Sequence, residues 1–134
     1  MRLSQRGSSS TGKNAGEVDI LISKDGLPFT VVEAMNLASV DTNYINKHLD
    51  KLFLYDTSGN RFNVCLSYVK VVDFISFWSK YSAHVANYSY AVPLISSDTS
   101  IDDEYGYSEL KIIKTTHNRS GKEVALYHIC VKIH

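Results

Sequence analysis

Two short stretches, "EVDILIS" (17–23) and "PFTVVEAMNL" (28–37), decide the fold of this 134-residue chain. The first alternates aliphatic residues with Glu17 and Asp19, and the second carries aromatic and β-branched residues before Glu33 and the apolar Ala34, Met35 and Leu37 after it. The turn "KDG" (24–26) between them predicts a β-hairpin. We therefore expect Asp19 on one strand and Glu33 on its antiparallel partner.

The remainder of the chain predicts helices and strands in alternation. We expect helices after Asp41 or Thr42 and near Asp73, a central strand within 61–72, an exposed polar loop at 96–108 and a second hairpin over 109–134. The resulting order, β-β-α-β-α-β-β, predicts an α/β fold in which a mixed sheet is flanked by helices.

Composition favours a single globular domain over residues 1–134, with 1–15 as a flexible lead-in that forms a short edge strand at most. The 14 basic residues balance the 14 acidic ones, so total charge does not indicate a strongly basic nucleic-acid binder. Cys65 and Cys130 lie in separate apolar runs and are predicted to be small buried hydrophobes. The polar segment after Met1 is unlike a signal peptide and no apolar run approaches the length needed to cross a bilayer, so we expect a soluble, cytoplasmic protein.

The segment from Gly7 to Lys13 has the spacing of a phosphate-binding P-loop, but its context is wrong for one. Asn14 stands where the motif needs a hydroxyl, and a strand follows where it needs a helix. Arg6 and Lys13 are therefore interpreted as solvated residues or as contacts to the phosphates of a larger ligand.

Asp19 and Glu33 are the stronger candidates, because a carboxylate within an apolar strand is costly to desolvate unless it is paired or binds a cation. Two carboxylates on adjacent antiparallel strands can converge on one divalent ion and leave positions open for water and a phosphate oxygen.

The segment resembles the PD-(D/E)XK nuclease superfamily, and within it the small bacterial endonucleases akin to Holliday-junction resolvases. The matching residues are Gly16, Glu17 and Asp19, followed by Val31, Val32 and Glu33. The resemblance covers roughly 16–72, and it implies a restriction-endonuclease-like fold in which Asp19 and Glu33 hold Mg²⁺ or Mn²⁺.

The sequence departs from the family pattern at Met35, where the family has a lysine that positions water and stabilises charge on the phosphate. Three explanations are open. A lysine reaches the site from elsewhere, with Lys47, Lys51 and Lys13 as candidates; or Glu17 enlarges the metal shell; or the site has lost activity and the fold binds nucleic acid only.

We therefore expect a metal-dependent endonuclease that hydrolyses DNA, with Lys47, less favourably Lys51, replacing the missing lysine. Arg6, Lys13 and Lys51 are expected to contact nucleic acid, DNA rather than RNA. The alternative is a catalytically degenerate nuclease fold that acts as a nucleic-acid-binding or protein-interaction module. A homodimer or a larger parent protein, by analogy a defence-system effector, would complete the fold.

The histidines are assigned to structural positions. His117 is predicted to lie in a turn, and His128 and His134 are predicted to be sheet residues and not metal ligands.

Overall fold

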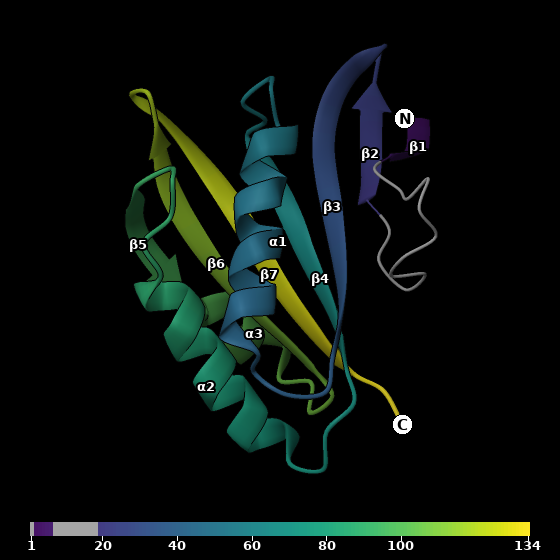
Figure 1. Ribbon diagram of the computed structural model, residues 1–134, viewed down its shortest axis with the longest axis vertical. Helices are drawn as coiled ribbons and strands as arrows, with labels where there is room; N and C mark the ends of the chain where they lie inside the picture. Colours follow the sequence, from purple (N-terminus) through teal and green to yellow (C-terminus); the bar gives the residue numbers. More distant parts are fainter. Residues whose placement is uncertain (1, 7–18) are drawn as a thin grey trace.

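Within the described residues, seven strands form one mixed sheet in the order β1-β2-β3-β4-β7-β6-β5, and α1 and α2 pack on one of its faces (Figure 1). The computed structural model describes residues 2–6 and 19–134, with the backbone alone for residues 2–6, 19, 28 and 103. The elements are β1 (Arg2–Arg6), β2 (Asp19–Lys24), β3 (Leu27–Leu37), α1 (Thr42–Tyr55), β4 (Phe62–Val69), α2 (Phe74–Asn87), β5 (Leu94–Asp98), α3 (Ser100–Tyr105), β6 (Leu110–Arg119) and β7 (Lys122–Lys132).

The predicted first hairpin is confirmed. Asp25 and Gly26 both have positive φ, 54° and 77°, as a tight two-residue turn requires, and β2 pairs with β3 antiparallel. In this register Asp19 lies directly opposite Glu33, and Arg6 of β1 lies opposite Asp19. The backbone thus aligns the positions of Arg6, Asp19 and Glu33 across three neighbouring strands.

The two long helices begin where the sequence predicts. Asp41 caps α1 by accepting a hydrogen bond from the backbone N–H of Tyr44 at 3.2 Å, and Asp73 caps α2 in the same way through Ser76 at 2.9 Å. Helix α1 connects β3 to the parallel strand β4 and buries Ile45, Leu49 and Leu52 completely. Burying each of these side chains contributes about 1.5–3 kcal/mol, which fixes α1 on the sheet.

The core lies between the sheet and the two helices. Alternate residues of β4 and β7 face it, including Cys65, Leu126 and Cys130, all fully buried. The two cysteines are free and buried, as predicted. Burial raises the pKa of the Cys65 thiol to about 12, so it stays protonated.

Three details differ from the sequence-based expectation. Strand β5 and the short helix α3 occupy most of the segment predicted to be a polar loop. Residues of β5 are mostly exposed, so this edge strand depends on backbone pairing with β6 and shows no apolar alternation. The predicted turn at His117 is wrong, because His117 is fully buried in β6.

The α/β class and the mixed sheet flanked by helices are confirmed. The predicted order of elements is wrong, because β1, β5 and α3 are additional elements.

Candidate functional site

The candidate site centres on Glu33, a fully buried carboxylate in the middle of β3. Its buried neighbours at alternate positions are Val31 and Met35, and Met35 belongs to the core against α1. Strand alternation therefore directs Glu33 toward the helix-covered face. A charged side chain in this position requires polar partners.

Helix α1 supplies those partners. Nδ1 of His48 lies 2.5 Å from Oε1 of Glu33, and Nζ of Lys51 lies 3.4 Å from the same oxygen. His48 and Lys51 are three residues apart, so they project from the same side of the helix. Because an ionised carboxylate only accepts hydrogen bonds, Nδ1 of His48 carries the proton and donates it.

His48 and Lys51 each also contact an aromatic ring of α1. The ring of His48 packs against Tyr44 with centroids 4.5 Å apart, and the ammonium of Lys51 lies 5.3 Å from the ring centre of Tyr55. His48 is buried, whereas the side chain of Lys51 retains 28% of its exposure. The lysine head therefore lies at the boundary between the buried carboxylate and solvent.

The second oxygen of Glu33 has a different environment. Among the described residues, Oε2 is buried and has no hydrogen-bond partner. Leaving a buried acceptor unsatisfied costs about 1–3 kcal/mol, and more for a charged group. His48 and Lys51 therefore both contact one oxygen, and the other oxygen is a buried acceptor that a cation or a hydrogen-bond donor would stabilise.

A buried carboxylate oxygen without a described partner is an atom type that a hard divalent cation accepts as a ligand. Mg²⁺ prefers oxygen ligands and is commonly held by one or two carboxylates together with water and phosphate. Oε2 of Glu33 supplies one such oxygen, and the register places the Asp19 position directly opposite. Within the described residues there is no group of three or more His, Cys, Asp or Glu side chains arranged around a common point. The side chains of Asp19 and Glu17, the other two carboxylates predicted for this site, are not among those described.

The structure distinguishes the candidate lysines. Lys51 lies beside Glu33, whereas Lys47 is exposed and makes no ion pair within the described part of the chain. Lys13 and Glu17 lie outside the described residues, and Arg6 is described by its backbone alone. Met35 is completely buried in the core, so the side chain at the position of the motif lysine does not reach solvent.

His48 was not identified from the sequence, although the helix pattern contains the clue. It lies on the apolar stripe of Ile45, Leu49 and Leu52, where a polar residue needs a buried partner. At about 100° per residue, Lys51 lies about 60° around the helix from His48, while Lys47 lies nearly opposite the centre of the stripe. Helix phase alone therefore favours Lys51 for a contact with β3.

A second buried polar cluster links β6, β7 and α2, but all its ring nitrogens are satisfied. Nδ1 of His117 donates to the carbonyl of Val92 at 3.0 Å, and its Nε2 accepts from Thr115 at 2.8 Å. Nε2 of His128 donates to the Thr115 oxygen at 2.9 Å, and its Nδ1 accepts from Tyr81 at 3.4 Å. Burial lowers the pKa of His128 to about 3, so the neutral ring is the stable form. We interpret this cluster as structural.

Comparisons of the chain with protein-family models, with curated proteins and with solved structures give no significant match. No helix in the described part of the chain has the length and apolar character needed to span a membrane.

Proposed function

We propose that this chain is a metal-dependent nuclease that hydrolyses phosphodiester bonds in DNA, with its active centre at Glu33. The observation that carries this proposal is the unequal environment of the two Glu33 oxygens. Oε1 is paired with His48 and Lys51, while Oε2 is buried without a described partner. A purely structural carboxylate would be stabilised more strongly if both oxygens accepted hydrogen bonds.

Glu33 would hold Mg²⁺ or Mn²⁺ through Oε2, together with Asp19 and with Glu17 as a further ligand. Such an ion, when bound, lowers the pKa of a coordinated water and offsets the charge of the phosphate. His48 acts as a positioning residue, because its hydrogen bond to Oε1 fixes the orientation of the carboxylate and leaves Oε2 available.

Lys51 replaces the missing motif lysine in this proposal. Its ammonium is 3.4 Å from Glu33 and partly exposed, so it can contact both the carboxylate and a phosphate arriving from solvent. A fixed positive charge at this boundary stabilises the negative charge that develops on the phosphate oxygens. We assign no catalytic role to Lys47, the candidate that the sequence favoured, because it is exposed and makes no ion pair within the described residues.

Arg6 and Lys13 would contact the DNA backbone. The backbone register aligns Arg6 with Asp19 and Glu33, which would bring a cation to the strand-edge side of the centre. Contacts of this kind neutralise phosphates without reading the base sequence, so binding would weaken as salt increases.

The second candidate function is a degenerate nuclease fold that binds nucleic acid or a protein without cleaving. Two observations favour it: Met35 occupies the motif lysine position, and Glu33 is fully buried. A homodimer or a larger parent protein remains part of either proposal.

Cleavage of labelled DNA in Mg²⁺ or Mn²⁺ tests the proposal with two matched lysine variants. Lys51→Met should reduce the cleavage rate about 100-fold, because it removes the charge beside the phosphate. Lys47→Met, four residues earlier on the same helix, should leave the rate within about twofold of the parent chain. Circular dichroism and thermal unfolding check that both variants fold.

Equal cleavage by the two variants would contradict the role of Lys51. Cleavage that persists in Glu33→Gln would contradict the centre itself. Metal binding without any cleavage by the parent chain would favour the degenerate module.

A further inference from the structure

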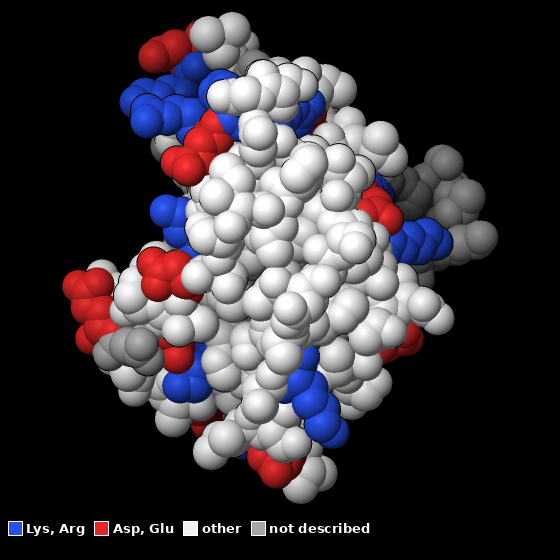
Figure 2. Space-filling model, turned by 90° about the vertical axis from the view of Figure 1, so that its left-hand side faces the viewer, with Lys and Arg blue, Asp and Glu red and all other residues white. Residues whose placement is uncertain are grey.

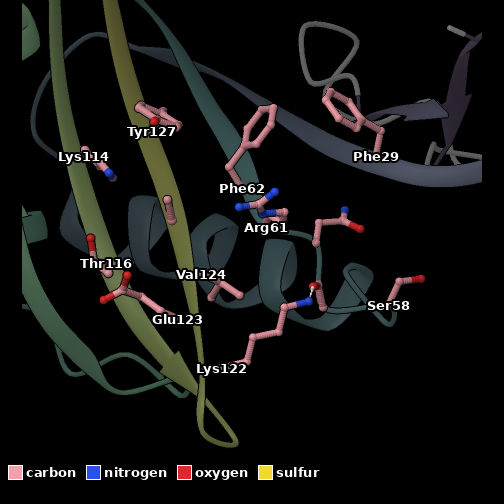
Figure 3. Close-up of a pocket in the computed structure, with 13 residues that line it drawn as sticks. Phe29, Ser58, Arg61, Phe62, Lys114, Thr116, Lys122, Glu123, Val124 and Tyr127 are labelled. Carbon is pink, nitrogen blue, oxygen red and sulfur yellow. Dashed lines mark hydrogen bonds between the residues drawn. The ribbon is translucent and has the colours of Figure 1, made fainter. Parts of the chain in front are cut away.

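A row of aromatic and cationic side chains crosses the face of the sheet opposite α1. Phe29, Phe62 and Tyr127 come from β3, β4 and β7, which are neighbouring strands. The rings of Phe29 and Phe62 meet edge to face at 5.3 Å, and those of Phe62 and Tyr127 at 6.0 Å. In Figure 3 the three rings follow one another across the strands, with α1 behind the sheet.

A lysine stands at each end of this row. Nζ of Lys24 on β2 and Nζ of Lys114 on β6 each lie 5.9 Å from a ring centre, over Phe29 and Tyr127 respectively. This distance is at the outer limit of a cation–π contact, so the rings hold both ammonium groups only weakly. We call these five residues, Lys24, Phe29, Phe62, Tyr127 and Lys114, the aromatic row.

A hollow of about 690 Å³ lies along the aromatic row and adds further charge. Its lining includes Arg61, Lys114 and Lys122, against the single carboxylate of Glu123. Arg61 makes no ion pair within the described residues, and Lys122 donates only to the carbonyl of Gly59, at 3.0 Å. Figure 2 shows the molecule hollowed on its left side, with Lys and Arg gathered around the upper part of the hollow and acidic groups beside them. A net positive site is thus concentrated here in a chain with no net charge.

A strand irregularity brings Phe29 to this face. Ile22 pairs with Thr30 but Ser23 pairs with Pro28, so the register of β2 on β3 passes over Phe29. Such a bulge re-aims a side chain, and here it allows Phe29 to meet Phe62 instead of joining Val31 and Glu33 on the helix-covered face. The aromatic row therefore depends on a departure from regular pairing.

We propose that the aromatic row and its hollow bind single-stranded nucleic acid. Rings on an open sheet face stack with unpaired bases, and flanking cations neutralise the phosphates between them. A duplex hides its base faces and would gain nothing from the rings. The hollow falls within the usual size of a small-ligand site, about 300–1,000 Å³, which suits one or two nucleotide units of a longer strand. The site lies on the opposite face of β3 from Glu33 and holds its ligand independently of hydrolysis.

Fluorescence anisotropy of a labelled twelve-residue oligothymidylate, measured with the full chain in EDTA, tests this proposal. The parent chain should bind the strand, and Tyr127→Leu or Phe62→Leu should weaken binding about tenfold or more through lost stacking. Arg61→Gln should lower the slope of log affinity against log salt by about 0.7, the value for one phosphate contact on a single strand.

Tyr68→Leu is the matched control, because Tyr68 is a 38% exposed tyrosine on the same face of β4, outside the hollow. It should bind as the parent does, and Glu33→Gln should also bind normally, which separates this site from the proposed nuclease centre.

Four results would overturn the proposal: unchanged binding in both ring variants, tighter binding of a duplex of equal length, equal affinity for thymidine monophosphate, or a dimer that the same ring substitutions dissociate. Thermal unfolding of each variant ensures that lost binding is not lost folding.

Discussion

Two buried carboxylates next to helix α1, Glu33 and Asp56, differ in how their oxygens are hydrogen-bonded. Asp56 follows the last turn of α1 and is 2% exposed. Both of its oxygens accept from the backbone N–H of Asn60 at 2.9 Å, and Oδ2 also accepts from the side chain of Asn63 at 2.8 Å. Arg119 approaches the same oxygen to 3.5 Å, as an ion pair and not as a hydrogen bond.

The network around Asp56 has an evident structural purpose. The side-chain oxygen of Asn63 in turn accepts a hydrogen bond from the backbone N–H of Val31 at 2.9 Å. The network therefore joins the loop after α1 to β3 and β4. Glu33, at 0% exposure, has donors on one oxygen and no described partner on the other. Burial alone therefore does not distinguish the two carboxylates, whereas the hydrogen bonding of their oxygens does, and this difference is why we propose a functional role for Glu33 and a structural one for Asp56.

Among the substitutions considered, we expect the largest loss of folding stability from a change at Asp56. Asp56→Asn turns an acceptor into a donor facing the N–H of Asn60 and the amide of Asn63, and it leaves Arg119 without its counter-charge. We expect the free energy of unfolding, measured by urea denaturation, to fall by about 3 kcal/mol.

Glu33→Gln is the matched control for that substitution. Glutamine keeps the acceptor for His48, its amide replaces an oxygen that had no described partner, and Lys51 can reach solvent. We expect a change of less than about 1 kcal/mol. A loss at Glu33 as large as the loss at Asp56 would mean that both carboxylates are structural.

The buried histidine cluster is also fully hydrogen-bonded, as Asp56 is, and we expect its disruption to cause a smaller loss of folding stability. Its hydrogen bonds require neutral rings, and the pKa of His128 is lowered to about 3 by burial, while that of His117 is lowered for the same reason. Below about pH 6.5 the unfolded chain binds protons that the folded chain excludes, so stability falls as the pH decreases from 6.5 toward 3. For His128 alone we expect a loss of about 2 kcal/mol between pH 6.5 and pH 5.

Chemical denaturation at both pH values measures this loss, with His128→Gln as the comparison. The variant should lose less stability on acidification, because one of the titrating groups is gone. Equal losses in the two chains would show that His128 does not govern the acid sensitivity.

Sequence patterns predicted the parts of the fold that short-range chemistry determines. The turn "KDG" predicted the hairpin, and Asp41 and Asp73 gave the helix starts. The Asp19–Glu33 pairing also needs the bulge at Phe29, because a regular ladder from the turn would place Asp19 opposite Val32. Strand β5 and helix α3 escaped prediction because their stability comes from pairing with β6 and from local hydrogen bonds, such as the one that the backbone N–H of Ser100 donates to Asp98. Neither leaves an apolar period in the sequence.

The candidate site was predictable in part. Glu33 stood out as a carboxylate in an apolar strand, but its pairing with His48 and Lys51 depends on how α1 is rotated against β3. The phase of the apolar stripe contains that information, and it favours Lys51 over Lys47. That Oε2 has no described partner depends on three-dimensional packing and could not be obtained from sequence spacing.

Titration calorimetry with Mn²⁺ tests most directly the claim that Glu33 is an incomplete metal centre. We expect the parent chain and Asp56→Asn, at a temperature where the latter is folded, both to bind Mn²⁺, while Glu33→Gln does not. Absence of Mn²⁺ binding by the parent chain, or undiminished binding by Glu33→Gln, would contradict it.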